Sequence, residues 1–111
     1  MKKGDVYFVN LTNTGASIQT GNRPCVIVQN DKGNQSSPTT IVVPITSVIK
    51  RMYLPTHVLI NDNQHLKYTS MALCEQVVTV SKSDINDYIT TLDDLTMRKI
   101  NSALLISLGI I

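Results

Sequence analysis

The chain consists largely of short runs of β-forming apolar residues separated by turn-forming residues, and this pattern limits the folds open to it. Val6–Leu11 is rich in valine and aromatic residues, and Pro24–Gln29 is a continuous apolar run of strand length. Further strands are expected at Thr40–Ile45, where Pro44 suggests an edge or a bulge, and at His57–Ile60. These four runs indicate a small, mainly β domain.

The last third of the chain is harder to assign until its final segment. Ser70–Val80 is long enough for one bent strand or for two, and Ser83–Tyr88 is compatible with one helical turn capped by Ser83. Asp93 is then expected to start a helix that ends before Gly109, a typical C-cap residue. Apolar residues recur in this helix at helical spacing: Met97, Ile100, Leu104 and Leu108.

These elements predict one domain over residues 1–111, mainly β with a C-terminal helix. A chain of 111 residues with 42% apolar residues is long enough to bury one core. Five or more short strands and one closing helix imply a small, strongly bent sheet or barrel packed on that helix.

Charge and cysteine content restrict the partners and the compartment. The net charge is only +2, so nucleic-acid binding would need a local basic site rather than a polybasic arm. No apolar run is long enough to cross a membrane, and Asp5 interrupts the start of a signal peptide. Cys25 and Cys74 lie in apolar runs, as reduced core thiols do. We therefore expect a reducing cytoplasm.

No metal or cofactor motif is present in the sequence. The two histidines and two cysteines do not follow the spacings of a metal site, and no phosphate-binding loop, nucleophile elbow or dinucleotide fingerprint occurs. His57 reads as a structural residue at a strand end, and His65 as a solvated loop residue. We expect neither a metal nor a cofactor.

Arg23 is the cation best placed for chemistry. It closes the long polar segment Thr12–Asn22 and precedes a core strand, where its planar guanidinium suits phosphate binding. The alternative is an ion pair with Asp31 or Glu75. Thr46 ends another strand and offers a hydroxyl, although threonines at strand ends are usually structural.

Two further pairs of polar residues are candidates for a weaker role. Lys50 and Arg51 form a small basic spot, whose default interpretation is a solvated surface. Glu75 and Gln76 are adjacent within an expected strand, which would direct them to opposite faces of the sheet.

In combination, several segments of the chain resemble the MazF/PemK family of toxin endoribonucleases. The resemblance extends from about residue 4 to the end, and the arginine–proline segment together with the strand ending in Thr46 is its most specific part. The segments that carry it are Gly4–Tyr7, Gly21–Asp31, Ser37–Thr46, Leu54–Val58, Leu73–Thr79 and Ala103–Gly109.

The resemblance implies an SH3-like barrel that forms a homodimer and cleaves single-stranded RNA at a short motif without a metal. The family's catalytic arginine and threonine match Arg23 and Thr46. The loop before the arginine contacts RNA in the family, so Ser17, Gln19 and Thr20 are expected contributors. Gln76 matches a glutamine expected to recognise a base.

One position departs from the family pattern. Many relatives carry an acidic residue in this loop where Ile18 stands here, so no role of that carboxylate transfers to this chain.

The chemistry of RNA fits the implied activity. Without a metal, the adjacent 2′-hydroxyl can attack the phosphate and leave a 2′,3′-cyclic phosphate and a free 5′-hydroxyl. A fixed arginine would stabilise the negative charge of the transition state, and a threonine hydroxyl would add a hydrogen bond. A guanidinium holds its proton too tightly to be an easy general base, so the identity of the base stays open.

Two other functions remain alternatives. A CcdB-type toxin resembles the same barrel but blocks DNA gyrase, through a tryptophan near the C-terminus, and this chain has no tryptophan. A barrel that binds without catalysis is the second alternative. The resemblance also implies a MazE-like antitoxin, with a disordered acidic segment that competes with RNA.

Overall fold

The structure, a computed structural model, describes residues 1–12, 18–61, 65–66 and 68–111. The strands are β1 (Asp5–Leu11), β2 (Gly21–Ile27), β3 (Thr39–Thr46), β4 (His57–Ile60), β5 (Ser70–Leu73), β6 (Val78–Ser81) and β7 (Ile85–Thr91). The helices are α1 (Asp31–Ser36), α2 (Asp94–Ser107) and two short 3₁₀ turns, η1 (Cys74–Gln76) and η2 (Lys82–Asp84).

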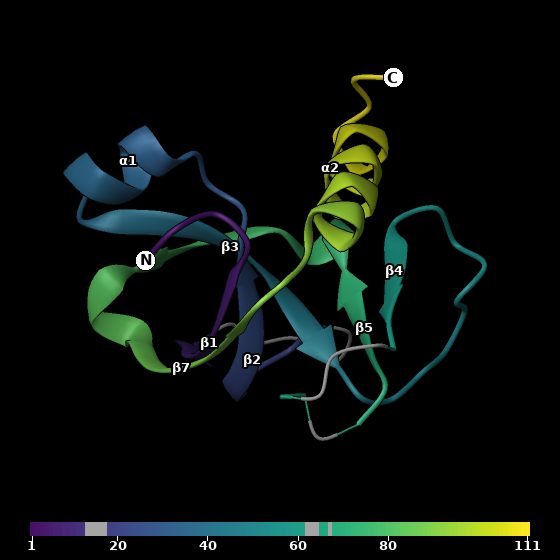
Figure 1. Cartoon of the computed structure of the whole chain (residues 1–111), viewed down its shortest axis with the longest axis horizontal. Coiled ribbons are helices and arrows are strands. Elements are labelled where there is room, and N and C mark those ends of the chain that lie inside the picture. Colours follow the sequence, from purple (N-terminus) through teal and green to yellow (C-terminus); the bar gives the residue numbers. More distant parts are fainter. Residues whose placement is uncertain (13–17, 62–64, 67) are drawn as a thin grey trace.

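The strands form one bent sheet in the order β4-β5-β3-β2-β1-β7, with β6 as an additional partner of β3 (Figure 1). Every pairing is antiparallel. The architecture, mainly β with a C-terminal helix, is confirmed. The barrel wording needs one correction, because β4 and β7, the ends of this strand order, are not paired within the described residues.

β3 is the strand on which the sheet divides. One edge of β3 pairs with β2, while the other edge pairs first with β6 and then, from Ile45 onward, with β5. Pro44 lies at this change of partner, between Val42, the last residue paired with β6, and Ile45, the first paired with β5. The proline therefore marks the point where the sheet divides, rather than an outer edge.

Alternation along the strands produces an apolar cluster on each face of the sheet. Val26 and Val43 belong to the larger cluster, which also contains Ile100 of α2. Their neighbours Cys25 and Val42 belong to the smaller cluster on the opposite face. The sheet is therefore buried on both sides near its middle, and its strand ends are left to form surface sites.

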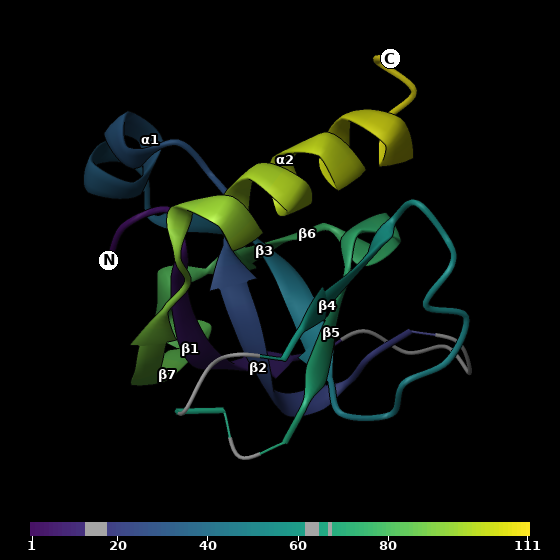
Figure 2. The same cartoon turned by 45° about the vertical axis from the view of Figure 1, so that its right-hand side comes forward.

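Helix α2 covers the larger cluster and lies across one side of the sheet (Figure 2). The predicted start is confirmed, because the Asp93 side chain accepts a hydrogen bond of 2.7 Å from the N–H of Thr96. Gly109, with φ 70°, follows the helix in the left-handed conformation expected of a C-terminal glycine. Ile100 is fully buried, but Leu108 is 60% exposed, so the apolar stripe ends earlier than predicted.

The structure settles two local predictions and contains one helix that was not predicted. Ser70–Val80 contains two strands with η1 between them. The predicted turn capped by Ser83 is wrong in position, because η2 is capped by Ser81 and the chain from Ile85 onward is strand. Helix α1 was not predicted, since its sequence has the composition of a turn.

Candidate functional site

Arg23 and Thr46 lie on neighbouring strands at the same end of the sheet. β2 and β3 pair in the register Cys25↔Pro44 and Val26↔Val43. Continued by two residues beyond Cys25, this register places Arg23 opposite Thr46, on the same face of the sheet. The fold therefore brings together the two side chains that the sequence singled out.

The Arg23 side chain is exposed and is held through one of its nitrogens. Its Nε donates a hydrogen bond of 2.9 Å to the backbone carbonyl of Thr20. The ion pairs considered as alternatives are not formed, since Asp31 accepts from the backbone N–H of Lys3 at 2.6 Å and Glu75 pairs with a histidine. The guanidinium is thus oriented by the backbone while it faces solvent.

Thr46 is almost buried, with 7% of the residue exposed, at the last position of β3. Its hydroxyl oxygen accepts a hydrogen bond of 3.1 Å from the N–H of Val48. A hydroxyl that accepts in this way still has its own hydrogen to donate. Thr46 can therefore shape the turn and also serve as a donor to a ligand.

The two residues line a hollow of about 490 Å³, which we call the groove. The other polar or charged side chains that line it are Gln19, Lys50, Arg51, His57, Glu75 and Gln76. Lys50 and Arg51 are exposed, as the default interpretation expected, but they lie beside the site and not elsewhere on the surface. The groove therefore combines several cations with two amides and one carboxylate.

Arg23 and Thr46 also line a second hollow of about 240 Å³, which we call the aromatic hollow. Its lining includes Phe8 and Tyr68, and Tyr68 is 61% exposed. Ser70 lines this hollow while the next residue of β5, Met71, lines the groove. Since successive strand residues face opposite ways, the two hollows lie on opposite faces of the sheet and meet at Arg23 and Thr46.

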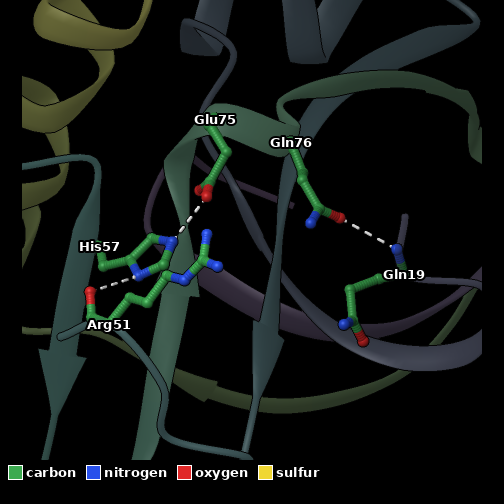
Figure 3. A network of polar contacts seen from close by, with 5 residues as sticks. All are labelled: Gln19, Arg51, His57, Glu75 and Gln76. Carbon is green, nitrogen blue, oxygen red and sulfur yellow. Dashed lines mark hydrogen bonds and ion pairs between the residues drawn. The ribbon is translucent and has the colours of Figure 1, made fainter. Parts of the chain in front are cut away.

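Gln19 and Gln76 are joined across the groove (Figure 3). The N–H of Gln19 donates a hydrogen bond of 2.9 Å to Oε1 of Gln76. Of the loop residues expected to contact RNA, Gln19 lines the groove and Thr20 contributes the carbonyl that orients Arg23. Ser17 lies outside the described residues.

Glu75 and Gln76 do not lie on opposite faces, and that prediction is wrong. Both belong to η1, and both line the groove, because a 3₁₀ turn does not alternate as a strand does. Oε2 of Glu75 lies 2.6 Å from Nε2 of His57, and the other ring nitrogen, Nδ1, lies 3.0 Å from the carbonyl oxygen of Arg51 (Figure 3). His57 is indeed a residue at a strand end, but its side chain is part of the groove.

Both cysteines are buried, free thiols, as predicted. Burial raises the pKa of the Cys25 thiol to about 12, and burial together with the neighbouring Glu75 charge raises the pKa of the Cys74 thiol to about 12. Neither thiol is therefore suited to nucleophilic chemistry.

Neither a metal-binding cluster nor a membrane-spanning helix occurs in the described part of the chain. No three His, Cys, Asp or Glu side chains there are grouped so as to hold a metal ion. Among the same residues, no helix has the length and apolar character needed to cross a membrane.

Comparison with known proteins gives matches over nearly the whole chain. Residues 2–108 match the family described as the PemK-like, MazF-like toxin of type II toxin-antitoxin systems. Endoribonuclease EndoA of Bacillus subtilis is 46% identical, with 100% of this chain and 97% of that protein covered. Endoribonuclease MazF of Staphylococcus saprophyticus is 43% identical, with 99% and 92% covered.

A solved structure agrees with these sequence matches. An endoribonuclease in complex with its cognate antitoxin, from a mycobacterial species, superposes with a TM-score of 0.84 at 27% identity. The match covers 100% of this chain and 97% of the other. The CcdB-type alternative is therefore not favoured, and the chain belongs to the PemK-like, MazF-like toxin family of type II toxin-antitoxin systems.

Proposed function

We propose that this chain is the toxin of a type II toxin-antitoxin system and acts as an endoribonuclease, cutting single-stranded RNA at a short sequence without a metal. The observation that carries the proposal is the placement of Arg23 opposite Thr46, where the groove meets the aromatic hollow. The relatives named as endoribonucleases supply the reaction class.

In the proposed reaction the nucleophile comes from the substrate. The 2′-oxygen forms a bond to phosphorus, and the bond from phosphorus to the 5′-oxygen of the next nucleotide breaks. The 2′-hydroxyl gives up its proton to a base, and the leaving 5′-oxygen takes up a proton, so the products are a 2′,3′-cyclic phosphate and a 5′-hydroxyl. Arg23 stabilises the charge on the phosphoryl oxygens, and the Thr46 hydroxyl donates a hydrogen bond to one of them.

The two hollows suggest how RNA would lie across the site. A phosphate held by Arg23 and Thr46 would send one flanking nucleoside into the groove and the other into the aromatic hollow. Tyr68 and Phe8 offer stacking surfaces, which accept any base. The amides of Gln19 and Gln76 can read base edges, so sequence preference would reside mainly on the groove side.

The decisive experiment is RNA cleavage by the wild type and by Arg23→Ala, in EDTA. We expect cleavage by the wild type and a loss of about 10²–10³-fold in the variant, the value of one donor to a charged transition state. Lys32→Ala, which removes a cation from exposed α1, is the matched control and should cleave normally. Cleavage abolished by EDTA, or full activity of Arg23→Ala, would contradict the proposal.

Inhibition by an antitoxin with a disordered acidic segment is part of the proposal. The solved relative is described in complex with its cognate antitoxin. Arg23, Lys50 and Arg51 give the groove a local positive charge that an acidic MazE-like segment could cover. Antitoxin and RNA would then exclude each other. An RNA affinity unchanged by saturating antitoxin would refute direct occlusion.

A homodimer is also proposed, with α2 and β4 as the candidate interface. Between these elements lies a hollow of about 620 Å³, lined in part by Leu95 and Ile106. Both residues are exposed, at 56% and 39%, and Leu108 is exposed on the same helix. Pairing would cover these apolar side chains. Light scattering that gives the monomer mass of 12.3 kDa at micromolar concentration would contradict it.

The remaining elements of the proposal are the compartment and the domain. Cleavage of RNA and the two buried free thiols are consistent with action in the cytoplasm. The family match over residues 2–108 supports a single domain spanning residues 1–111.

A further inference from the structure

Glu75 is the one carboxylate among the residues that line the groove, and it is the only glutamate in the chain. RNA brings a row of phosphates to the site, and an uncompensated carboxylate would repel them. A carboxylate in such a place requires an explanation. The explanation lies in its contact with His57.

Each ring nitrogen of His57 has an oxygen as its hydrogen-bond partner. The side chain is only 7% exposed, and Nδ1 lies 3.0 Å from the carbonyl oxygen of Arg51. A carbonyl can only accept, so Nδ1 carries a hydrogen. Nε2 lies 2.6 Å from Oε2 of Glu75, and two lone pairs at this distance would repel. A hydrogen bond therefore joins Nε2 and Oε2, so that Oε2 of Glu75 is not left unpaired in the groove.

His57 also holds the backbone of residues 47–56, which we call the basic loop. Arg51 has φ 51°, a left-handed conformation that is uncommon for a residue other than glycine. Its carbonyl accepts from the N–H of Leu54 at 3.0 Å as well as from His57. The N–H of His57 in turn donates to the carbonyl of Leu54 at 3.0 Å. One side chain thus fixes the loop that brings Lys50 and Arg51 to the groove.

We infer that His57 is a positioning residue for RNA binding, whose two side-chain hydrogen bonds mask the carboxylate of Glu75 and hold the basic loop against the groove. This inference rests on the proposed function of the groove. Loss of the imidazole breaks both hydrogen bonds and leaves the carboxylate of Glu75 unpaired beside the RNA. RNA binding then weakens, while the chemical step at Arg23 and Thr46 is not directly altered.

The other charged groups around His57 belong to two elements. Lys50 and Arg51 of the basic loop line the groove with it, and Arg98 and Lys99 of α2 line the hollow on its other side. All four are cations. Glu75 is therefore the carboxylate, among the residues lining these two hollows, with which the imidazole can pair.

The test compares wild type, His57→Phe, Glu75→Gln and the double variant at one pH and one ionic strength. Two readouts are used: KM and kcat on single-stranded RNA, and the Kd of a 2′-fluoro-substituted RNA that cannot be cut. Asp87→Asn, which removes one exposed negative charge from β7 outside the groove, is the matched control.

For His57→Phe we expect Kd and KM to rise roughly fivefold above the wild type, the factor that a partly screened charge contact contributes, with little change in kcat. Glu75→Gln should bind about as the wild type does, because its amide oxygen can still accept from Nε2. Asp87→Asn should also bind as the wild type does. The double variant should recover part of the loss in His57→Phe, because the unmasked carboxylate is gone, whereas a merely structural defect would not be repaired by Glu75→Gln.

Two results would overturn the inference. A folded His57→Phe variant that binds RNA as tightly as the wild type would do so, as would a double variant no better than His57→Phe. If His57→Phe fails to fold, the same comparison is made with His57→Gln, whose amide can keep only one of the two hydrogen bonds. RNA binding that responds to these variants as expected, without any cleavage, would refute the proposed function and leave this inference standing.

Discussion

The hydroxyl of Thr46 has two possible tasks, and substitution can separate them. Thr46→Val keeps the shape of the side chain and removes the hydroxyl, whereas Thr46→Ser keeps the hydroxyl and removes a methyl group. The bond of 3.1 Å from Val48 is a neutral hydrogen bond, whose loss costs about 1 kcal/mol of unfolding free energy. The methyl of a residue that is 7% exposed contributes a similar amount, about 1 kcal/mol.

Thr46→Val and Thr46→Ser should differ much more in activity than in stability. A hydrogen bond to a charged phosphoryl oxygen is worth about 1.5–3 kcal/mol, which corresponds to a loss of about 10- to 150-fold in kcat for Thr46→Val. Thr46→Ser should stay within about threefold of the wild type, since it still donates. A stability loss of about 1 kcal/mol leaves a typical domain folded, so unfolding cannot mimic this difference.

The assay is single-turnover cleavage of RNA by the three proteins, beside urea unfolding of each. Two variants with similar midpoints and very different rates would establish the hydroxyl as a donor in the reaction. Equal rates for Thr46→Val and the wild type would refute the reasoning and leave Thr46 as the residue that shapes the turn into the basic loop.

Three further predictions concern the remainder of the fold. With thiol pKa values of about 12, Cys25 and Cys74 should resist maleimide at pH 8 in the folded protein and react once it is unfolded in urea; fast native labelling would contradict this. Ile100→Ala should lower the unfolding free energy by about 2–5 kcal/mol, because this side chain of α2 is fully buried in the larger apolar cluster. An unchanged midpoint of unfolding in urea would argue against it. The hydrogen bonds from Thr96 lower the pKa of Asp93 below its ordinary value of 3.8. The ionised Asp93 carboxylate therefore stabilises the folded protein above pH 3.8, and this stabilisation is lost as the pH falls through the lowered pKa. Asp93→Ala should therefore melt earlier at neutral pH, and its difference from the wild type should close in acid.

Most strands and the last helix could be predicted because local patterns specify them. Continuous apolar runs such as residues 25–27 become strands buried on both faces, and the helix start at Asp93 follows from a capping side chain. Arg23 and Thr46 were found as candidates because each lies at the end of such a run. Their placement opposite each other depends on strand register, which no local pattern specifies.

Helix α1 escaped prediction because it is stabilised by contacts with distant residues. Its residues Asp31–Ser36 have the composition of a turn, and the helix has fewer than two full turns. Asn34, which is buried, accepts from the Thr40 hydroxyl at 2.6 Å, and its carbonyl accepts from the Lys82 ammonium. Both partners lie outside the helix, and Lys82 is 48 positions away, so the sequence of the helix alone does not reveal these hydrogen bonds.

The partner of Glu75 could not be predicted for a related reason. Glu75 and His57 are 18 positions apart, and the strand assignment for residues 70–80 placed Glu75 and Gln76 on opposite faces of the sheet. The 3₁₀ turn η1 arises because the chain must leave β5 and join β6 beside the same strand, β3. Only the three-dimensional arrangement reveals this requirement.

The sheet divides at Pro44 of β3, where one edge of the strand changes partner from β6 to β5. This division affects how toxins of this family could diversify. Arg23 and Thr46 sit on paired strands, whose spacing is set by the backbone, while Gln76 sits on the short crossing between β5 and β6. A residue inserted in or deleted from that crossing would move Gln76, proposed to recognise a base, relative to the proposed catalytic pair and leave the ladder between β2 and β3 intact. New target sequences could thus evolve through changes in the connections, while the proposed catalytic geometry is kept.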